Sequence, residues 1–188
     1  IWQHQKLGSV SESVLGKMLD AKKNKGVLQP YLRNINVRWG AFDLADLKEM
    51  KFEEHEESRY SIRDGDLIVC EGGEPGRSAV WRSDESIKLQ EALHRVRLND
   101  GYSPEYVYFF LFYAAQTGTL KKYFTGTTIK HLTGQKLRSV ETPFGSFSDQ
   151  LSVVREISNR LSLHEIIHND INISITKSDV LKQSILKK

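Results

Sequence analysis

The first 150 residues contain short stretches in which hydrophobic and polar side chains alternate, and each predicts a β-strand with one buried face. Residues 31–44, YLRNINVRWGAFDL, alternate in this way, and so do residues 92–98, ALHRVRL. The polar positions of the first stretch are mainly arginine and asparagine, which are strong hydrogen-bonding side chains. Its apolar positions, which we expect to face a core, are Leu32, Ile35, Val37, Trp39 and Phe42.

Residues 63–81, RDGDLIVCEGGEPGRSAVW, predict two strands joined by a glycine-rich turn. Asp-Gly-Asp signals a turn, LIVC is apolar enough for a buried strand, and GGEPG ends that strand before RSAVW returns. Cys70 lies in the buried run, so we expect a structural thiol. A cysteine nucleophile with a distant histidine is the alternative.

A buried helix is predicted after Ser103, which can act as an N-cap, with Pro104 at the first helical position. The residues that follow are dense in aromatic side chains, which suits a buried helix. Residues 125–144 are typical of a loop followed by a strand. Residues 1–147 therefore predict a mixed α/β domain.

The pattern changes after Ser148 to that of one long helix. Residues 151–188 contain no glycine, proline or aromatic residue, and apolar side chains recur at steps of three and four. Ser148 can cap this helix, and Asp149 suits its positive end. At ~1.5 Å per residue such a helix would be about 57 Å long. The β-branched run INISIT weakens it and allows a break near 172–176.

The apolar stripe of this helix is wider than a narrow coiled-coil seam, which indicates contact with more than one neighbour. One helix cannot bury such a stripe alone, so we expect a partner helix from a second copy or from sequence outside these 188 residues. The fold class predicted is α+β, with a coiled-coil-forming segment over residues 148–188. The expected helical interface is Val154, Ile157, Leu161, His164, His168, Ile171, Ile175 and Ile185.

Composition is typical of a globular chain, with 39% hydrophobic and 27% charged residues. No apolar run reaches the roughly 20 residues that a bilayer span requires, so no membrane is expected. A single cysteine suits a reducing cytoplasm. Residues 1–38 hold seven basic and two acidic residues, whereas residues 39–70 hold four and nine. This asymmetry is compatible with nucleic-acid binding and equally with internal pairing.

His164, Glu165 and His168 form the pattern H-E-x-x-H, which on a helix can place two imidazoles on one zinc ion. No histidine or glutamate follows residue 168 to supply a third ligand. Two polar residues that set the register of a helical interface explain the pattern better. We expect no metal here.

Four acids surround the predicted strand LIVC, and they are Asp64, Asp66, Glu71 and Glu74. Clustered acids of this kind are compatible with a metal-dependent nuclease. The lysine that such sites usually carry is missing from CEGGEPG, and GGEPGR lacks the G-K-[ST] ending of a phosphate-binding loop. A nuclease centred on Glu71 stays open as an alternative.

The order of the motifs resembles the specificity subunit of Type I restriction-modification systems. The motifs are WQHQKLGSV, YLRNINVRWGAFDL, IRDGDLIVCEGGEPGRSAVW, LHRVRL, SPEYVYFFL, GTTIKHLTGQKLRSVETPF and, after the long helix begins, VVREISNRLSLHEI and VLKQSILKK. Each is degenerate alone, but their order and spacing are specific. Full members hold two recognition domains and two helical spacers, and this chain has one of each. It looks like one half, either a fragment or a natural half-subunit.

This resemblance implies a non-catalytic protein that reads one part of a split double-stranded DNA target. Its helical spacer would pair antiparallel with a second spacer. The implied protein partners are an adenine methyltransferase subunit and a restriction subunit that acts as motor and nuclease. S-adenosylmethionine, ATP and Mg²⁺ are expected on those partners, and no cofactor is expected on this chain.

Lysine and arginine suit phosphate contacts, whereas arginine, asparagine and threonine suit base reading. The loop with Lys22, Lys23 and Lys25 is the natural phosphate binder. Trp39 and Trp81 are expected in the core. For every candidate the alternative is an ordinary solvated side chain. The further DNA-binding candidates are Arg33, Asn34, Asn36, Arg38, Arg77, Thr125, Thr127, Thr128, Lys130 and His131.

Two other function classes remain open from the residues alone. One is an enzyme, either the nuclease or the zinc peptidase described above. The other is a coiled-coil adaptor without a nucleic-acid role. Sequence-selective DNA affinity separates the specificity subunit from the adaptor, and metal-dependent cleavage identifies the enzyme.

Overall fold

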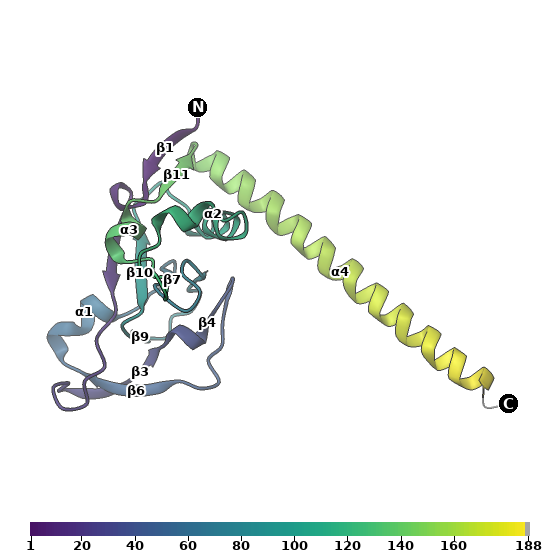
Figure 1. Ribbon diagram of the computed structural model, residues 1–188, viewed down its shortest axis with the longest axis horizontal. Coiled ribbons are helices and arrows are strands. Elements are labelled where there is room, and N and C mark those ends of the chain that lie inside the picture. Colours follow the sequence, from purple (N-terminus) through teal and green to yellow (C-terminus); the bar gives the residue numbers. More distant parts are fainter. Residues whose placement is uncertain (187–188) are drawn as a thin grey trace. The chain divides into compact units, whose positions relative to one another are not determined.

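The computed structural model describes residues 1–186, and backbone contacts divide the chain into two units (Figure 1). The first unit is Ile1–Gln150, and the second begins at Leu151. Strands and helices make up the first unit, and the second is helical. The predicted α+β class with a long C-terminal helix is therefore confirmed. The functional roles given to residues 1–147 and 148–188 remain predictions.

The largest sheet is antiparallel and has four strands in the order β2 (Ser11–Leu15), β10 (Leu93–Leu98), β7 (Leu67–Cys70) and β8 (Ser78–Val80). β7 is buried along its whole length, as the run LIVC predicts. The glycine-rich turn joins β7 to β8, which pair antiparallel. The strand–turn–strand prediction is confirmed, and so is the strand within ALHRVRL.

The remaining strands form three smaller sheets. β3 (Val27–Leu32) pairs antiparallel with β6 (Lys48–Phe52) and parallel with the short β9 (Lys88–Leu89). β4 (Val37–Arg38) pairs with β5 (Ala41–Phe42). β1 (Gln3–Lys6) pairs with β11 (Glu141–Phe144), so the two ends of the first unit meet in one sheet.

The main helix of the first unit is α2 (Pro104–Gln116), and it begins as the sequence predicts. The hydroxyl of Ser103 accepts a hydrogen bond from the Tyr106 backbone N–H at 3.2 Å, and Pro104 holds the first helical position. Shorter turns connect the strands. They are the 3-10 helices η1 (Leu7–Ser9), η2 (Asn34–Asn36), η3 (Glu54–Glu56) and η4 (Thr119–Tyr123), and the α-helices α1 (Glu57–Tyr60) and α3 (Gly134–Arg138).

A hydrophobic core joins strands of the two larger sheets, and it includes Leu32, Ile68 and Leu93. Trp81 is 2% exposed, and its ring meets Phe42 edge-on with 5.0 Å between the centroids. Cys70 belongs to the same cluster. Burial raises the pKa of its thiol to about 11, so it stays protonated and unreactive at neutral pH. The predicted structural thiol and the core position of Trp81 are confirmed.

The alternating stretch 31–44 is not one strand, so that prediction is wrong. β3 ends at Leu32, and η2 follows before β4 and β5 begin. The Asn36 side chain accepts a hydrogen bond from the Arg33 N–H at 2.9 Å and donates to the Asp43 carbonyl at 2.9 Å. Such side-chain bonds to the backbone compete with strand pairing. Ile35 consequently points outward and is 55% exposed.

The long helix α4 (Phe147–Leu186) has 40 residues and extends about 60 Å at ~1.5 Å per residue. Its cap is Ser146 rather than the predicted Ser148. The Ser146 hydroxyl accepts from the Asp149 N–H at 3.2 Å, and the Asp149 carboxylate accepts from the Ser146 N–H at 3.1 Å. The hydrogen bond from the Ser146 hydroxyl is the main reason that the pKa of Asp149 lies below its ordinary value.

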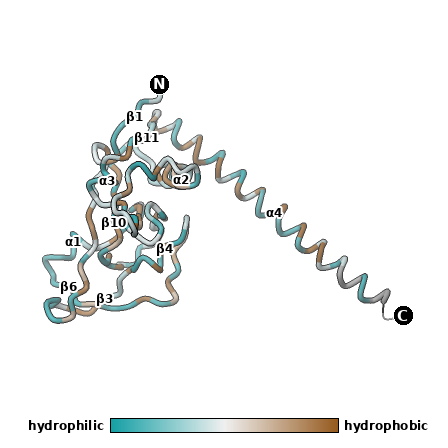
Figure 2. Tube along the Cα trace, viewed as in Figure 1, coloured by the Kyte–Doolittle hydropathy of each residue, from teal (hydrophilic) through white to brown (hydrophobic). Residues whose placement is uncertain are grey.

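The break allowed near residues 172–176 does not occur, because α4 is continuous there (Figure 1). The hydroxyls of Ser174 and Thr176 donate to the carbonyls of Asp170 and Asn172 at 2.8 and 2.9 Å, so these side chains bond within the helix. Hydrophobic and hydrophilic positions alternate along α4 in Figure 2. Within the described residues, no helix has both the length and the apolarity of a membrane span.

We expect the substitution Gln150→Ala to lower the free energy of unfolding by about 1–3 kcal/mol. Gln150 is 1% exposed, accepts from the Ser103 N–H at 3.0 Å and donates to the carbonyls of Gly101 and Gly145 at 3.2 and 3.1 Å. The substitution leaves these groups unpaired in the interior. Urea unfolding measures the difference, and the exposed Gln116→Ala is the control. Equal stability of the two variants would contradict a structural role for the Gln150 amide.

Candidate nucleic-acid interface

Residues 71–77, here called the glycine turn, are the point at which three distant segments of the chain meet. Gly73 and Gly76 have φ angles of +72° and +94°, which side-chain-bearing residues rarely adopt. A Cβ atom on Gly76 would lie 2.3 Å from Leu120 Cδ2. Glycine is therefore required at position 76 by both backbone conformation and space.

The first segment at the glycine turn is η2. The Asn34 side-chain amide donates to the Gly72 carbonyl at 2.7 Å. Arg77 Nη2 donates to the Asn34 side-chain oxygen at 2.7 Å and to its backbone carbonyl at 3.0 Å. The Arg77 side chain is only 16% exposed. Asn34 and Arg77 thus lock η2 onto the glycine turn.

The second segment follows β4 and contributes Trp39. Its indole N–H donates to Glu74 Oε1 at 2.6 Å, and Arg77 Nη1 donates to the other Glu74 oxygen at 3.0 Å. The indole also meets Phe112 of α2 edge-on, with 5.1 Å between the centroids. Trp39 is half-buried, so it lies at the rim rather than inside the core as the sequence predicts.

The third segment is residues 125–131, here called the threonine loop. The N–H of Leu132, directly after it, donates to the Glu71 carbonyl at 2.7 Å. Reciprocal backbone bonds between Thr125 and His131, at 2.8 and 2.9 Å, close the loop. Thr127, Thr128 and Lys130 are exposed at its tip. The threonine loop is thus a short exposed loop on a fixed base.

Beneath the threonine loop, Glu71 lies between two histidines. His94 is 1% exposed, and its Nε2 is 2.9 Å from one Glu71 oxygen. His131 Nδ1 is 4.0 Å from the other oxygen. Burial lowers the pKa of His94, and the charge of Glu71 opposes that shift only in part. Glu71 therefore supports the base of the loop.

Several candidate residues of the sequence use their polar atoms within the protein. Asn36 is 3% exposed, and its amide bonds the backbone around η2, including the Asp46 carbonyl at 3.2 Å. Arg33 forms an ion pair with Asp46, with 2.7 Å between Nη2 and Oδ2. Arg38 is half-exposed and lies 3.5 Å from Asp43. The sequence did not predict Asp46 and Asp43 as partners. They follow η2 by several residues, and the chain brings them close to Arg33 and Arg38 only because it turns at η2.

The lysine loop, residues 20–26, contacts β6 instead of the glycine turn. The Asp20 carboxylate accepts the backbone N–H groups of Lys22 and Lys23, both at 3.1 Å, which fixes the turn. The Asn24 amide donates to the Met18 carbonyl at 3.1 Å and lies 3.7 Å from the Met50 sulfur. The side chains of Lys22, Lys23 and Lys25 are exposed.

The four acids of the nuclease hypothesis do not converge. Asp66 is 1% exposed and receives two bonds from Arg97, at 2.8 and 2.7 Å. Asp64 pairs with Arg82 at 3.1 Å. Glu71 faces His94, and Glu74 binds Trp39 as described above. Each acid has its own partner, so the structure gives the nuclease alternative no support.

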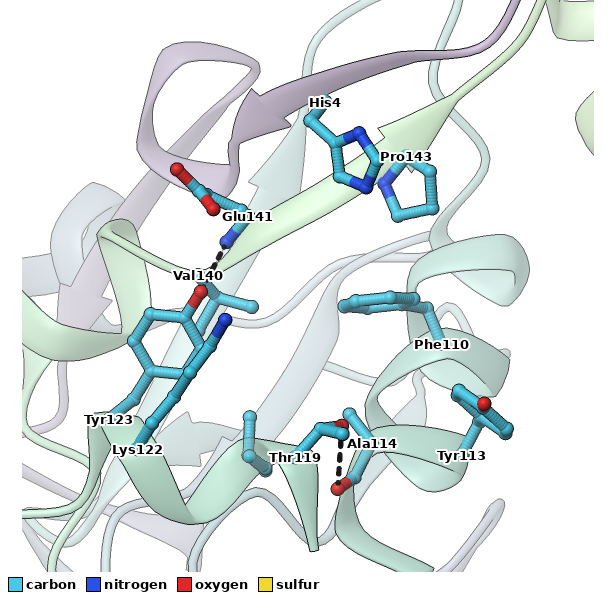
Figure 3. Close-up of a pocket in the computed structure, with 11 residues that line it drawn as sticks. His4, Phe110, Tyr113, Ala114, Thr119, Lys122, Tyr123, Val140, Glu141 and Pro143 are labelled. Carbon is cyan, nitrogen blue, oxygen red and sulfur yellow. Dashed lines mark hydrogen bonds between the residues drawn. The ribbon is translucent and has the colours of Figure 1, made fainter. Parts of the chain in front are cut away.

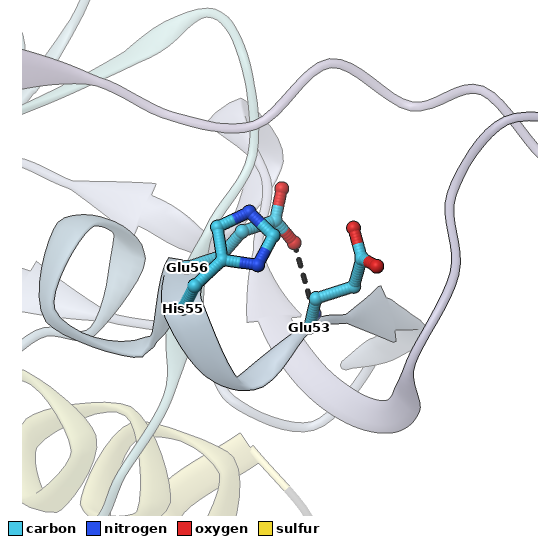
Figure 4. A group of neighbouring side chains, drawn as sticks. All are labelled: Glu53, His55 and Glu56. Carbon is cyan, nitrogen blue, oxygen red and sulfur yellow. Dashed lines mark hydrogen bonds between the residues drawn. The ribbon is translucent and has the colours of Figure 1, made fainter.

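Among the described residues, one group has metal-ligand types close together, namely Glu53, His55 and Glu56, whose ligand atoms lie within 4.8 Å of one another (Figure 4). Glu56 already accepts from the Glu53 N–H at 2.9 Å and pairs with Lys17. Burial raises the pKa of Glu56, but these hydrogen bonds outweigh it and hold the pKa below its ordinary value. The group thus anchors Lys17.

Figure 3 shows a pocket of about 330 Å³ between α2, η4 and β11. Its lining includes Tyr113, Lys122 and Pro143. The Glu141 N–H donates to the Tyr123 hydroxyl at 3.0 Å there, and the Thr119 hydroxyl donates to the Ala114 carbonyl at 3.3 Å. These polar groups serve the packing of neighbouring elements.

The apolar stripe of α4 is open to solvent. Leu161, Ile171 and Ile175 are 51%, 52% and 55% exposed. The imidazoles of His164 and His168 stack along the same helix, with 6.1 Å between their centroids and 10° between their planes. Val154 and Ile157 are half-buried. The side chain of Ile185 lies outside the described residues, so its predicted place in the interface is untested.

No known family model matches the sequence. The chain is 27% identical to the specificity subunit of the Type I restriction enzyme EcoKI from Escherichia coli K12, over 188 residues. That alignment includes 94% of this chain and 40% of the relative. The chain therefore spans less than half the length of this relative. The resemblance predicted from the motifs is confirmed as a similarity to specificity subunits.

Solved structures from type I restriction-modification systems have a fold similar to that of this chain. One belongs to a study of complex assembly and conformational transition in the type I R-M system, with a TM-score of 0.74 and 15% identity. The match covers 100% of this chain and 45% of that one. Another is the HsdS subunit from Thermoanaerobacter tengcongensis, with a TM-score of 0.64, 15% identity, and 86% and 37% of the two chains covered. Identity this low establishes the fold alone.

We expect the free energy of unfolding to decline as the pH falls from about 7.5 to about 5.5, with His94 as one cause. Burial lowers the pKa of His94 in the folded state, so the unfolded chain binds this proton more readily. Stability from this group is present above the unfolded pKa of about 6.5 and is lost below it. Urea unfolding at several pH values measures the slope.

The variant His94→Gln should reduce this pH dependence, whereas the exposed His55→Gln should retain it. An unchanged slope in His94→Gln would mean that the pH dependence arises from other groups.

Proposed function

We propose that this chain is one recognition half of a type I restriction specificity subunit, which binds double-stranded DNA in a sequence-specific way and catalyses no reaction itself. One structural observation carries this proposal. Three segments, η2, the residues around Trp39 and the threonine loop, converge on the glycine turn through side-chain and backbone hydrogen bonds. The similarity to the EcoKI specificity subunit supports the same function.

In this proposal the threonine loop reads bases. The major groove presents donors and acceptors that differ between base pairs, and hydroxyl, ammonium and imidazole groups can bond to them. Thr127, Thr128 and Lys130 are exposed at the tip, and His131 lies at the base with 44% of its side chain exposed. A loop on a fixed base loses little conformational entropy on binding, which favours discrimination.

Arg33, Asn34, Asn36 and Arg77 have a supporting role in this proposal. Their side chains hold η2 and the glycine turn in place through bonds to each other, to Asp46 and to the backbone. Changes in these residues would then alter DNA affinity by moving the threonine loop and the rim. Arg38 is half-exposed and can reach a phosphate.

The lysine loop binds the DNA backbone in this proposal. Its three exposed ammonium groups attract phosphate, and neutralised phosphates release counterions into solution. That contribution is independent of sequence. Readout and backbone contact thus come from different loops of the first unit.

The exposed stripe of α4 pairs with a second spacer helix in this proposal, in an antiparallel coiled coil. Burial of the isoleucine and leucine side chains would stabilise the pair by about 25 cal/mol per Å² of apolar surface. The stacked His164 and His168 lie on that stripe and would set its register. The methyltransferase and restriction subunits would assemble with this pair in the cytoplasm, and S-adenosylmethionine, ATP and Mg²⁺ would bind to those subunits.

The test of this function is a selection from random duplex DNA with the chain and its methyltransferase subunit together, followed by sequencing of the retained duplexes. A short enriched motif, repeated in inverted orientation at a fixed gap if two copies pair, is the expected result. Retention without any enriched motif would contradict sequence-specific recognition and favour an adaptor that binds DNA non-specifically.

We expect the triple substitution of Lys22, Lys23 and Lys25 by alanine to weaken binding to all duplexes alike. The logarithm of affinity should also depend less steeply on the logarithm of salt, by about 0.9 for each phosphate that the variant no longer neutralises. Fluorescence anisotropy over a range of salt concentrations measures this slope. The control is Lys136→Ala, an exposed lysine outside the loop. An unchanged slope in the triple variant would remove the lysine loop from the interface.

Replacement of Thr127 and Thr128 by alanine should instead change which duplexes are enriched. Removal of a hydroxyl that reads a base should reduce discrimination at one position by about 1–3 kcal/mol and leave the salt dependence unchanged. The selection described above measures this, with Thr117→Ala beyond the end of α2 as the control. Identical enriched motifs in both variants would show that the threonine loop does not read bases.

We expect Leu161→Asp together with Ile171→Asp to abolish self-association of the chain. Each substitution places a charge in the apolar stripe that a partner helix would bury. Sedimentation equilibrium measures the change, with Arg155→Asp and Lys177→Asp as exposed controls on the same helix. A wild-type chain that stays monomeric at high concentration would contradict pairing between copies.

A further inference from the structure

A second basic surface lies beside the free edge of β2, away from the lysine loop in sequence. It is a hollow of about 650 Å³, here called the arginine hollow. Its lining brings together residues from β2, α1, β10 and α3. The groups that matter are the guanidinium groups of Arg59, Arg95, Arg97 and Arg138 and the hydroxyls of Ser13 and Ser58.

The floor of the arginine hollow is rigid. Arg95 is 2% exposed, and its Nη1 donates to the carbonyls of Ser58 and Ser61 at 3.2 and 2.8 Å. Arg97 is held by Asp66 through Nε and Nη2, and its Nη1 has no hydrogen-bond partner among the described residues. Guanidinium groups fixed in this way keep their geometry when a ligand arrives.

The rim of the hollow carries unbalanced positive charge. On the floor, Arg95 has Glu12 at 3.2 Å and Arg97 has Asp66 at 2.7 Å. Among the side chains that the structure describes, no acid pairs with Arg59 or Arg138. Arg59 stacks 5.4 Å from the Tyr60 ring centroid, and Arg138 Nη1 is 3.5 Å from the Ser13 hydroxyl. The hollow is therefore built to receive an anion.

The anion that fits best is a phosphate. Planar guanidinium forks match the oxygens of phosphate in pairs, and hydroxyl groups can donate to the remaining oxygens. β2 is also the edge strand of its sheet, and an antiparallel pair with β10 uses the N–H groups of only every second residue, so the other N–H groups have no partner among the described strands. Guanidinium and hydroxyl donors thus line one hollow.

The arginine hollow is linked to the base of the threonine loop through β10. His94 and Arg95 are neighbours on that strand, and their side chains point to opposite faces of the sheet. Around Gly134, the side chains of His94 and Arg138 come so close that a Cβ atom there would lie 3.3 Å from each. The same histidine contacts Glu71 beneath the threonine loop. A phosphate held by Arg138 is therefore tied to the loop through packed side chains.

We propose that the arginine hollow binds a backbone phosphate of the target duplex and so fixes the position of the DNA relative to the threonine loop. This inference rests on the proposed DNA-binding function and adds a second backbone site to the lysine loop. Phosphate contacts of this kind set register and orientation without reading sequence. The rigid floor supplies the geometry, and Arg59 and Arg138 supply the charge.

The test is fluorescence anisotropy of Arg59→Gln, Arg138→Gln and the double variant, over a range of salt concentrations, with an enriched duplex and a scrambled one. The double variant should bind both duplexes more weakly by the same factor, and its salt slope should fall by about 1–2. The control Arg82→Gln removes an exposed guanidinium elsewhere and should have a smaller effect. Both test residues are exposed, and circular dichroism checks that the variants fold.

A second measurement identifies the source of the phosphate. The duplexes for this measurement each carry one neutral methylphosphonate linkage in place of a phosphate. Replacement of one particular phosphate should weaken wild-type binding to the affinity of Arg138→Gln. Arg138→Gln itself should bind that modified duplex and the unmodified duplex equally. If no linkage behaves in this way, or if the salt slope of the double variant equals that of the wild type, the inference is wrong.

These experiments test phosphate binding in the arginine hollow separately from sequence-specific DNA recognition by the chain. An unaltered slope with an intact enriched motif overturns the arginine hollow alone, whereas the absence of any enriched motif overturns the proposed function. Polyglutamate is the competitor that probes the other occupant. Polyglutamate that binds the wild type but not the double variant would occupy the hollow. If it does so without displacing DNA from the wild type, the hollow is a site for acidic protein segments and the phosphate assignment is wrong.

Discussion

The contact between Arg77 and Asn34 is the constraint on which the surface of the first unit depends. Arg77 donates to both oxygens of Asn34, and Asn34 donates to the Gly72 carbonyl, so the glycine turn and η2 hold each other in place. Since the polar groups are partly buried, removal of either side chain leaves its partner unpaired, which lowers the free energy of unfolding by about 1–3 kcal/mol. The threonine loop then joins this base through the Glu71 carbonyl. Three segments far apart in the sequence become one surface because this base is rigid.

Local patterns predicted the local elements. The run LIVC with its glycine-rich turn, the Ser103–Pro104 helix start and the long C-terminal helix each depend on neighbours within a few positions. All three occur, although the long helix begins at Phe147 and is capped by Ser146 rather than by the predicted Ser148. The prediction of one strand over residues 31–44 was wrong because the Asn36 side chain bonds the backbone of Arg33 and Asp43, and alternation alone cannot reveal that. The sequence also did not reveal ion pairs between residues that are far apart along the chain. Asp66 was a candidate metal ligand, whereas Arg97, 31 residues away, takes both of its oxygens. Glu71 was a candidate in the same hypothesis and instead supports a loop.

The candidate DNA-binding residues divide into two physical classes that the sequence does not distinguish. Asparagine and arginine near η2 are hydrogen-bonding types in either class, but burial decides their role, and Asn36 at 3% exposure can contact nothing outside the protein. The exposed loops are different, because the side chains of Thr127, Thr128, Lys22 and Lys25 are exposed at their surface. Lys130 Nζ donates to the Gly126 carbonyl at 2.7 Å, and Lys23 pairs with Asp20 at 3.5 Å, so these two ammonium groups would exchange a protein partner for DNA. Arginines of the hollow were not candidates at all, because they come from β10, α1 and α3, and only the fold gathers them. The apolar stripe of the helical unit is exposed, and in the proposed function it pairs with a partner helix rather than with DNA.

Hydrogen–deuterium exchange of the chain with its methyltransferase subunit, with and without DNA, tests the central claim most directly. It resolves which backbone segments a duplex protects. We predict that an enriched duplex protects residues 125–131 and 71–77, whereas a scrambled duplex protects only the backbone-binding surfaces, the lysine loop and the arginine hollow. Equal protection of residues 125–131 by both duplexes, or by neither, would contradict the claim that the threonine loop on its rigid base reads the DNA sequence.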